Sequence, residues 1–265
     1  MSRKRKIGII GFGNMGSAIA ERIKARYTVW LYDKDKNKLK GLKDIPVAQN
    51  NSDLVKKVDA VLLAVKPQDF DATLDEIRSA VSDKLIISIA AGIRTIYIEK
   101  FLGNVRVVRV MPNMPLRIGE GMSCLCKGRF ATDDDLAFGQ KLFDAAGRTL
   151  ILDEGLMNAA TAVSGSGPAY VCYYLESKKQ NLLADFPKAA EGVGFSSKEA
   201  EFLVQATYSG TIDFLKKTKI LPSELRIQVT SKGGTTEAAL KVLDGGCSLQ
   251  DAVKAALIRA EELSL

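Results

Sequence analysis

The sequence predicts an α/β domain with a doubly wound, mostly parallel sheet, followed by an all-α domain. Two observations support this fold class. The first half alternates short apolar runs with amphipathic segments, and several runs are almost pure Val, Ile, Leu and Ala, as expected for strands covered on both faces. After Asp153 alanine becomes frequent and strand-like runs end. We therefore expect two domains, residues 1–153 and residues 154–265.

The expected strands are short apolar runs, and the expected helices are the amphipathic segments between them. The strands are Lys6 to Ile10, Thr28 to Tyr32, Ala60 to Val65, Leu85 to Ala91 and Val105 to Val110, with Gly121 to Cys126 and Arg148 to Leu152 extending the sheet. The helices are Met15 to Ala25, Ser52 to Val58, Gln68 to Val81 and Ala131 to Ala146. Strand, helix and strand repeated in this way form a parallel sheet with right-handed crossovers.

The second domain is expected to contain helices only. They are Met157 to Thr161, Pro168 to Leu183, Ser196 to Leu215, Thr236 to Leu243 and Leu249 to Leu263. Short breaks separate them at Gly192-Val193-Gly194, Leu221-Pro222 and Gly245-Gly246. Ser248 is a suitable N-cap for the last helix because its hydroxyl can accept from a first-turn amide.

Composition is that of an ordinary globular protein, with 46% apolar and 26% charged residues among 265. No apolar run approaches the roughly 18 residues of a membrane-spanning helix. The start, Ser2 to Lys6, is basic, but glycines and Asn14 interrupt the apolar residues after it, so we do not expect a signal peptide. We expect a cytoplasmic protein with no membrane partner. The net charge of +7 is scattered with no basic stripe, so we expect no nucleic-acid partner, and an anionic cofactor and small substrate explain the basic excess equally well.

The chain has no histidine. This excludes mechanisms that need an imidazole as general acid or base, including histidine-dependent serine and cysteine hydrolases. It also makes a zinc site with the four cysteines improbable, and we expect no metal. Cys124 and Cys126 are interpreted as reduced thiols of a cytosolic core.

A glycine turn comes after the first strand and opens the first helix. It reads Gly11-Phe12-Gly13-Asn14-Met15-Gly16 and fits G-x-G-x-x-G. In this context Gly11 allows the tight turn, Gly13 lets a pyrophosphate approach the backbone, and Gly16 permits close helix–strand packing. The phosphates would accept hydrogen bonds from the helix N-terminus, including residues Asn14 and Met15. The turn therefore predicts a nicotinamide-dinucleotide enzyme that transfers a hydride.

The end of the second strand bears on which dinucleotide is used. Asp33 lies roughly 20 residues after the turn, where an acidic residue commonly binds the ribose 2′-hydroxyl, which favours NAD. Lys34, Lys36 and Lys38 stand beside it and can accept a 2′-phosphate, or can simply form a solvated turn. The choice between NADH and NADPH stays open.

Three more strand ends carry candidate binding residues, because open α/β sheets bind ligands at the carboxyl ends of their strands. They are Ala64-Val65-Lys66-Pro67, Ser88-Ile89-Ala90-Ala91-Gly92 and Met111-Pro112-Asn113-Met114-Pro115. Lys66 is expected at the sheet rim beside the cofactor, with a plain surface lysine as the alternative. Asn113 can present its amide to nicotinamide or substrate, or form a simple turn.

Two segments of small residues stand out in the helical half. Ser164-Gly165-Ser166-Gly167-Pro168-Ala169-Tyr170 has a proline where a helix would begin. Ser231-Lys232-Gly233-Gly234-Thr235-Thr236 exposes amides and hydroxyls at a helix start, which is suited to binding a carboxylate, although helix capping alone would use the same residues.

Together these segments resemble the pyrroline-5-carboxylate reductase family over nearly the whole chain. The matching motifs are Ile7 to Gly16, Ala64 to Pro67 (A-V-K-P), Ser88 to Gly92 (S-I-A-A-G), Met111 to Pro115 (M-P-N-x-P), Val163 to Tyr170 (V-S-G-S-G-P-A-Y) and Gly233 to Thr236 (G-G-T-T). The resemblance implies NAD(P)H-dependent reduction of 1-pyrroline-5-carboxylate to L-proline, the last step of proline biosynthesis. It implies a Rossmann domain and a helical dimerisation domain, in a homodimer or an oligomer of dimers whose active sites form near the subunit contact.

The resemblance also implies site residues. Asn51, Ala64, Lys66 and the adjacent Pro67 would contact the cofactor. Catalytic Ser231 and Thr236, with Gly234 and Thr235, would hold the substrate carboxylate and ring nitrogen, Thr236 lying nearest the nitrogen. Three departures from the family pattern are Lys232 in place of a proline, Ile227 in place of an acidic residue, and the segment Lys178 to Phe195 in place of an alanine- and glycine-rich helix pair.

This chemistry suits a site without histidine. A protonated cyclic imine accepts hydride at carbon without an acid of tuned pKa, so the protein mainly positions the reactants. One alternative is a β-hydroxyacid dehydrogenase, but the lysine that family uses is absent after Gly167. The other is a non-catalytic dinucleotide-binding homologue.

Overall fold

The computed structural model describes residues 4–177 and 181–265. Met1 to Arg3 of the basic start, and Lys178 to Gln180 of the segment that departs from the family pattern, lie outside the described residues. The chain divides into two compact units, one comprising Met1–Val110, Leu125–Ala146 and Leu265, the other Met111–Cys124 and Gly147–Ser264. A single boundary near Asp153 stays a prediction.

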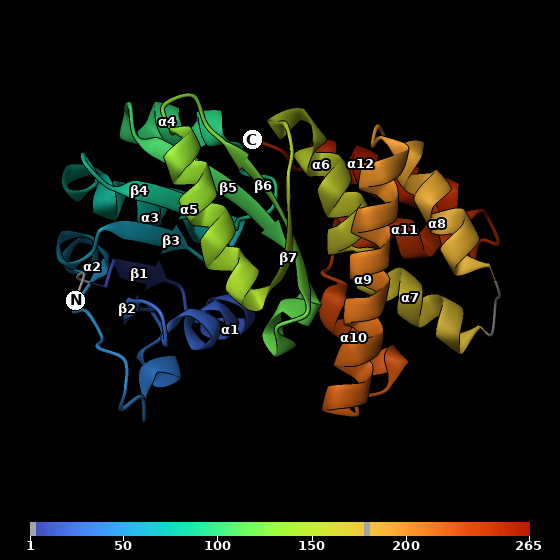
Figure 1. Cartoon of the computed structure of the whole chain (residues 1–265), viewed down its shortest axis with the longest axis horizontal. Helices are drawn as coiled ribbons and strands as arrows, with labels where there is room; N and C mark the ends of the chain where they lie inside the picture. Colours follow the sequence, from blue (N-terminus) through green and yellow to red (C-terminus); the bar gives the residue numbers. More distant parts are fainter. Residues whose placement is uncertain (1–3, 178–180) are drawn as a thin grey trace. The chain divides into compact units, whose positions relative to one another are not determined.

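The strands form a seven-stranded sheet (Figure 1). They are β1 (Lys6–Ile10), β2 (Thr28–Tyr32), β3 (Ala60–Leu63), β4 (Leu85–Ser88), β5 (Arg106–Pro112), β6 (Gly121–Lys127) and β7 (Gly147–Ile151), in the order β2-β1-β3-β4-β5-β6-β7. Neighbours from β2 to β5 are parallel. Strand β2 pairs with one edge of β1, and β3 pairs with the other edge. The strand order therefore changes direction at β1, and open α/β sheets bind ligands at such a switch point.

The sixth strand runs against the fifth. The amide of Gly128 donates to the carbonyl of Val107 (2.8 Å), and the amide of Asn113 donates to that of Met122 (3.1 Å), so the paired residue numbers change in opposite directions. The predicted α/β fold with a mostly parallel sheet is confirmed.

The first unit has five α-helices among its described residues. They are α1 (Asn14–Ile23), α2 (Asn51–Lys57), α3 (Phe70–Ile77), α4 (Thr95–Leu102) and α5 (Asp133–Phe143). In α3 the residues Phe70, Leu74 and Ile77 recur on one face and are fully buried. All four residues of β3 and of β4 are buried, as the nearly pure apolar runs predicted. The helix α5 crosses one face of the sheet (Figure 1), and Gly139 lets it approach Val108.

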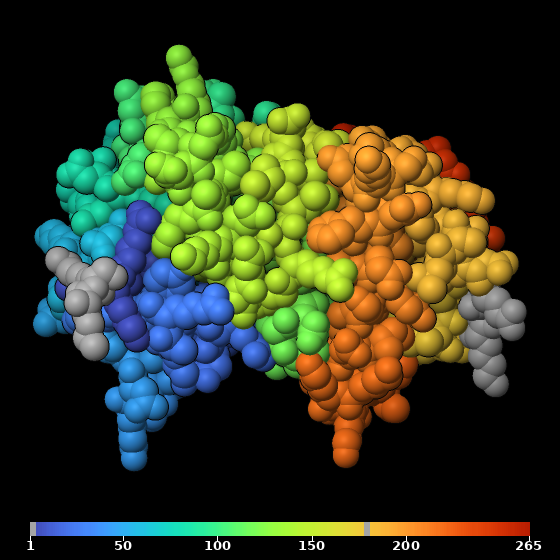
Figure 2. All heavy atoms as spheres, in the orientation of Figure 1, coloured from blue at the N-terminus to red at the C-terminus, as the bar shows by residue number. Residues whose placement is uncertain are grey.

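The second unit contains β7, the end of β5 and the start of β6, and its other regular elements among the described residues are helices. Its helices are α6 (Met157–Ala160), α7 (Gly167–Glu176), α8 (Leu182–Glu191), α9 (Ser197–Thr218), α10 (Pro222–Val229), α11 (Thr235–Asp244) and α12 (Leu249–Glu262), with a π-helical turn at Thr161–Gly165. Figure 2 shows the same face with side chains filling the spaces between the ribbons of each unit. The predicted N-cap Ser248 accepts from the amide of Asp251 at 3.1 Å.

The predicted helix from Pro168 to Leu183 is wrong. The helix α7 ends at Glu176, and α8 starts at Leu182 after Asn181, whose φ of 83° is incompatible with a continuing right-handed helix. Helices α4, α8 and α10 were not expected. A proline, Pro187, lies inside α8, which hid its apolar periodicity. No helix within residues 4–177 and 181–265 is long and apolar enough to cross a membrane.

Candidate active site

A cavity of about 450 Å³ lies in the first unit, within the usual size for a cofactor site. It opens where β1, β2 and β3 end, at the switch point of the sheet. Sequence-predicted residues that line it are Gly11, Gly13, Asp33, Lys34, Asn51, Ala64 and Lys66, and further lining residues include Tyr32, Lys38, Gln68, Asp69, Thr73 and Glu76. Asn14, Met15, Gly16 and Pro67 are adjacent in sequence but are not part of its lining.

The three glycines of the turn have different surroundings. Gly11 has a φ of 97°, and a Cβ added there would lie 2.5 Å from the carbonyl oxygen of Ala64. A Cβ on Gly16 would collide with the carbonyl oxygen of Gly11. A Cβ on Gly13 would meet nothing within 4 Å. The missing side chains of Gly11 and Gly16 therefore let the turn pack closely against the Ala64 carbonyl and against its own Gly11 carbonyl, whereas the space beside Gly13 is open toward the cavity.

The N-terminus of α1 is suited to anion binding. Gly13 is its N-cap, with no side-chain cap, and the first turn contains no acidic residue. The first amides of a helix have no intrahelical acceptor and carry the positive end of the helix dipole. This is the arrangement that binds a pyrophosphate.

Asp33 is a buried carboxylate, 6% exposed, that holds the glycine turn. Its Oδ2 accepts from the amide of Phe12 (2.7 Å), and its Oδ1 accepts from the amide of Asp35 (2.8 Å). Burial acts to raise the pKa of Asp33, but these two amide hydrogen bonds and Lys38 at 3.3 Å outweigh it and lower the pKa below its ordinary value. The carboxylate is thus ionised and already bonded, and its contact with a ribose hydroxyl stays a prediction.

Asn51 supplies an acceptor without a protein partner. The side chain is 6% exposed, and its Nδ2 donates to Glu76 Oε2 at 2.8 Å. Its Oδ1 is buried and has no hydrogen-bond partner among the described residues. A buried unpaired acceptor is costly unless a ligand completes it. Because Asn51 lines the cavity, this oxygen fits a ribose hydroxyl or adenine amine, and the residues present therefore fit a dinucleotide.

The three lysines next to Asp33, namely Lys34, Lys36 and Lys38, each have a partner. Lys34 pairs with Asp69 at 2.6 Å, and this hydrogen bond raises the pKa of Lys34. Lys38 pairs with Asp33, and Lys36 lies 3.9 Å from the ring centre of Tyr32. Lys66 is exposed at the rim of the cavity. The arrangement leaves both NADH and NADPH open.

The second unit contains the segment Ser231 to Thr236, which leads into α11. Gly234 is the N-cap of this helix and has no side-chain cap. Its amide donates to the carbonyl of Ser231 at 3.0 Å, and a Cβ on Gly234 would collide with Ser231 Oγ. The amides of Thr235 and Thr236 are in the first turn, where no intrahelical acceptor exists. The geometry therefore provides the amide donors that a carboxylate needs.

Two contacts hold this segment from outside. Arg259 Nε, on α12, donates to the carbonyl of Gly233 at 2.7 Å. The amide of Gly233 donates to Glu237 Oε2 at 2.9 Å, and this hydrogen bond, with the charges of Lys241 and Lys232, lowers the pKa of Glu237. Lys232, which replaces a proline of the family pattern, is exposed.

A cluster of hydroxyls joins this segment to the start of α7. Thr236 Oγ1 donates to Ser166 Oγ at 3.0 Å, and Thr235 Oγ1 lies 3.0 Å from the same atom. Ser166 is fully buried and Thr236 is 4% exposed. Tyr170, also fully buried, donates from its hydroxyl to the carbonyl of Ala162 at 2.9 Å. The π-helical turn before α7 places Ser166 here, and such turns are frequent at functional sites.

Asn113 has a different local environment. It is 1% exposed, its Oδ1 accepts from the amide of Met122 (2.8 Å), and its Nδ2 lies 3.2 Å from Ser164 Oγ. Thr207 donates to the same Ser164 oxygen at 3.0 Å. The side-chain amide therefore holds Met122 and Ser164 in place, and its contact with nicotinamide or substrate stays a prediction.

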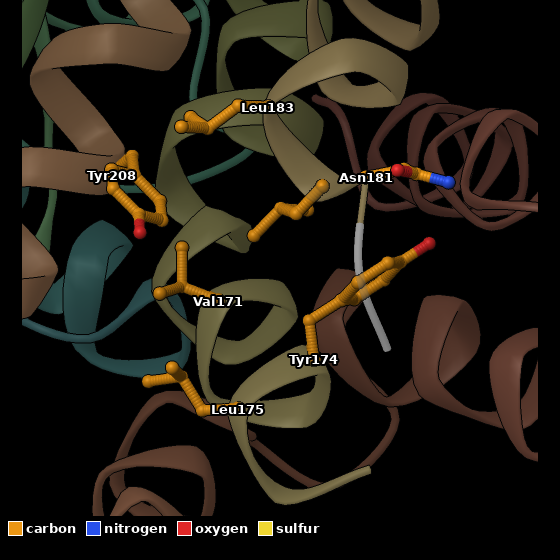
Figure 3. A pocket seen from close by; sticks show the side chains of 7 residues that line it. Val171, Tyr174, Leu175, Asn181, Leu183 and Tyr208 are labelled. Carbon is orange, nitrogen blue, oxygen red and sulfur yellow. The ribbon is translucent and has the colours of Figure 1, made fainter. Parts of the chain in front are cut away.

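A second cavity, of about 240 Å³, lies among α7, α8 and α9. Figure 3 shows Val171, Leu175, Leu183 and Tyr208 around it, from all three helices. Most of this lining is apolar, and Leu175 and Leu183 are 44% and 48% exposed. It offers no group suited to hydride-transfer chemistry.

The structure brings part of the predicted cofactor set together around one cavity, namely Gly11, Gly13, Asp33, Lys34, Asn51, Ala64 and Lys66. It brings Ser231, Gly234, Thr235 and Thr236 together at one helix start, whereas Asn113 contacts Met122 and Ser164 instead. Sequence reasoning did not assign roles to Glu76, Ser166, Tyr170 and Arg259. Ser166 and Tyr170 lie in a segment already singled out for its small residues, but no local pattern connects Ser166 with Thr236, 70 positions later.

Family comparisons cover both halves. Residues 154–263 match the family described as pyrroline-5-carboxylate reductase dimerisation, and residues 6–92 match the one described as NADP oxidoreductase coenzyme F420-dependent. The pyrroline-5-carboxylate reductase of Haemophilus influenzae is 38% identical over 271 residues, 97% of this chain and 97% of that protein.

Two solved structures have the same fold over nearly full length. A pyrroline-5-carboxylate reductase from Coxiella burnetii has a TM-score of 0.68 and 32% identity, covering 99% of this chain and 100% of that one. Plasmodium falciparum pyrroline carboxylate reductase with NADP bound has a TM-score of 0.67 and 28% identity, covering 98% of each chain.

Proposed function

The chain belongs to the pyrroline-5-carboxylate reductase family, and from this premise we propose that it catalyses NAD(P)H-dependent reduction of 1-pyrroline-5-carboxylate to L-proline. The observation that carries this proposal is the start of α11, where uncapped amides and the Thr236 hydroxyl lie side by side. Amides bind a carboxylate and a hydroxyl binds a ring nitrogen, and the substrate carries both groups on adjacent positions. The alternatives, a β-hydroxyacid dehydrogenase and a non-catalytic homologue, are not favoured.

A reduced nicotinamide dinucleotide held at the cavity of the first unit would supply the hydride that adds to the imine carbon, and with the proton already on the ring nitrogen this would convert the C=N bond into the C–N single bond of a secondary amine. The residues around Gly13 and Asn51 bind and orient the dinucleotide. The amides of Thr235 and Thr236 fix the carboxylate, and the Thr236 hydroxyl orients the ring nitrogen. No general acid of tuned pKa is required, because the protonated imine is already electrophilic, which agrees with a chain that has no histidine.

The assembly proposed is a homodimer formed through the helices of residues 154–263, the region that matches the family's dimerisation domain. Leu175 and Leu183, which are exposed beside the apolar cavity of α7, α8 and α9, and Phe202, 37% exposed on α9, supply apolar surface for this contact. A cytoplasmic location, expected from the sequence, remains a prediction.

A spectrophotometric assay tests the proposal. Purified protein is mixed with 1-pyrroline-5-carboxylate and either NADPH or NADH, and loss of the reduced nicotinamide absorbance is followed. We expect turnover with at least one cofactor and none with a 3-hydroxy acid and oxidised cofactor. Cofactor binding without turnover would instead identify a non-catalytic homologue, and turnover of the hydroxy acid would identify a dehydrogenase.

A further inference from the structure

The segment Ser231 to Gly234, directly before α11, is a β-turn. The amide of Gly234 donates to the carbonyl of Ser231 at 3.0 Å, which is the hydrogen bond that closes such a turn. Gly233 has a φ of 70°, whereas the φ of Lys232 is not positive. A negative φ followed by a positive φ defines the type II turn, in which glycine is favoured at the third position.

The residues of this turn do not select the type II form by themselves. A type I turn differs by a rotation of the central peptide, between Lys232 and Gly233, and has a negative φ at the third position. Glycine adopts both signs of φ, so Gly233 permits either form. A proline at position 232, as in the family pattern, would fix the φ of the second position, and lysine does not. Contacts from outside the turn must therefore hold its conformation.

Glu237 holds the central peptide of the turn. Its Oε2 accepts from the amide of Gly233 at 2.9 Å. Rotation of this peptide would exchange the Gly233 amide for the Lys232 carbonyl, and the carbonyl oxygen would then face a carboxylate that repels it. Because Glu237 lies in the first turn of α11, this hydrogen bond also joins the β-turn to the helix that comes after it.

Arg259, on α12, holds the next peptide, between Gly233 and Gly234. Its Nε donates to the carbonyl of Gly233 at 2.7 Å, and its Nη2 lies 3.7 Å from the position that a Cβ of Gly233 would take. Glu262, on the same helix, accepts from Nη1 of this guanidinium at 2.7 Å and keeps it in place. Since the Gly234 amide donates to Ser231, both polar groups of this peptide are bonded.

Both peptides before α11 are therefore held, and the next amides along the chain are those of Thr235 and Thr236. These are the amides that, on the proposed function, bind the substrate carboxylate. Donors whose orientation is fixed before the ligand arrives lose less conformational entropy when the ligand binds. The contacts of Glu237 and Arg259 thus bear on carboxylate binding although they are made to the turn.

We propose that Glu237 and Arg259 are positioning residues for the substrate carboxylate, which hold the type II turn and so orient the first amides of α11. They act on the substrate through the turn, and neither needs to contact it. The inference rests on the proposed function, because it concerns the substrate of that same site.

Holding the turn and attracting by charge predict opposite effects for the loss of Glu237. Glu237 is an anion in the first turn of a helix that would bind another anion, and its oxygen lies 3.5 Å from Lys241 Nζ. By charge alone, removing this carboxylate relieves a repulsion and leaves Lys241 without this partner, so an anionic ligand should bind more tightly. If Glu237 holds the turn, the same ligand should bind more weakly.

Substitutions at two positions separate these effects. Glu237→Gln removes the charge but keeps an oxygen that can accept from Gly233, whereas Glu237→Ala removes both. Arg259→Ala removes the hydrogen bond to the Gly233 carbonyl, and adding Lys232→Pro fixes the second φ of the turn while it takes away a positive charge. The turn does not use the amide of its second position, so proline is compatible with it. The matched control is Glu261→Ala, which removes an exposed carboxylate of α12 that makes none of the contacts above.

The experiment measures the Kd of L-proline, the product of the proposed reaction, by calorimetry with enzyme saturated with oxidised cofactor. This ligand carries the carboxylate, and its binding needs no turnover. We expect Glu237→Ala and Arg259→Ala to raise the Kd about fivefold or more, the scale of one lost hydrogen bond, and Glu237→Gln and Glu261→Ala to stay within about twofold of the wild type. Adding Lys232→Pro to Arg259→Ala should recover about half of the loss or more.

Unchanged or tighter binding of L-proline by Glu237→Ala would overturn the inference, as would equal weakening by Glu237→Ala and Glu237→Gln, or no binding by the wild type. A further loss, or no recovery, on adding Lys232→Pro would overturn the role of Arg259 in holding the turn. Thermal melting identifies any variant that does not fold, and the comparison at either position alone tests the inference. The proposed function is tested separately, because it fails if the wild type does not turn over the imine with reduced cofactor.

Discussion

Two glycines of the dinucleotide turn, Gly13 and Gly16, are expected to respond in opposite ways to the same substitution by alanine. In Gly13→Ala the new methyl group meets no protein atom within 4 Å, and the backbone, with φ −82° and ψ −164°, is extended and open to alanine. The folded state is therefore not strained. Because alanine reduces the entropy of the unfolded chain, stability should be unchanged or higher by about 0.4–1 kcal/mol.

The cost of Gly13→Ala falls on the cofactor instead. The methyl group would occupy the space through which, on the proposed function, a pyrophosphate approaches the N-terminus of α1. Forcing a methyl group into a well-packed contact costs about 1–3 kcal/mol, which corresponds to a Kd for NADPH or NADH roughly 5- to 150-fold weaker. Fluorescence titration of reduced cofactor and a thermal melt of the free protein measure the two effects separately.

Gly16→Ala is the matched comparison. Its methyl group would collide with the carbonyl of Gly11 and lie 3.3 Å from the Ala64 side chain, so the turn itself must move. We expect a lower Tm together with weaker cofactor binding. If Gly13→Ala binds cofactor as tightly as the wild type, or melts as early as Gly16→Ala, the assignment of the open space beside Gly13 to the pyrophosphate is refuted.

Four further outcomes are expected. Thr236→Ala should lower kcat/KM about tenfold or more, which is the scale of one oriented hydrogen bond. Thr236→Ser should retain most of the wild-type kcat/KM, because it keeps the hydroxyl. If steady-state kinetics show no loss in the alanine variant, Thr236 has no part in the mechanism. Asn51→Ala should weaken reduced-cofactor binding about five- to tenfold, because the unpaired Oδ1 is lost as a ligand; an unchanged Kd in a fluorescence titration would contradict this. Asp33→Asn should lower the free energy of unfolding by about 1–3 kcal/mol, since both carboxylate oxygens accept amides. Because the folded pKa of Asp33 is lowered, the stability difference between the wild type and Asp33→Asn should be fully present above the ordinary carboxylate pKa of about 4. It should disappear as the pH falls through the pKa of the folded state. Denaturant unfolding measures this difference at each pH, and a difference that stays constant over the range would contradict the prediction. Leu183→Glu, which places a charge in exposed apolar surface beside the α7–α9 cavity, should shift the homodimer toward monomer in analytical ultracentrifugation, and an unchanged sedimentation profile would exclude that surface from the contact.

The strands were predicted more accurately than the helices. β1 and β2 have the bounds expected, because a short, mostly apolar run between polar residues has few alternatives in a buried sheet. β3 and β4 end two and three residues earlier than expected, at Leu63 and Ser88. The apolar residues directly after β3, Ala64 and Val65, line the cavity at the switch point of the sheet and do not extend the strand, although their sequence is typical of a strand.

The helices that were missed have identifiable causes. Pro187 interrupts the pattern of α8 although the helix continues through it. The helix α10 is short, with Ile227 exposed at 72%, so it lacks a continuous apolar face. The break between α7 and α8 depends on the left-handed backbone of Asn181, which no apolar period reveals.

The sequence by itself indicated the class of cofactor and the kind of chemistry, and it singled out two candidate binding segments, Gly11 to Gly16 and Ser231 to Thr236. The glycine spacing at Gly11 to Gly16 is a local feature, and it acts through backbone sterics. The missing histidine is a feature of composition, and it acts through side-chain chemistry. Only the tertiary structure decided which groups are already bonded. It shows that Asp33 and Asn113 use their polar atoms on the protein's own backbone and side chains, and that Asn51 keeps one oxygen unpaired. It also brings Ser166 to Thr236 across 70 positions, because burial and helix packing, which depend on the whole chain, set where a hydroxyl finds its partner.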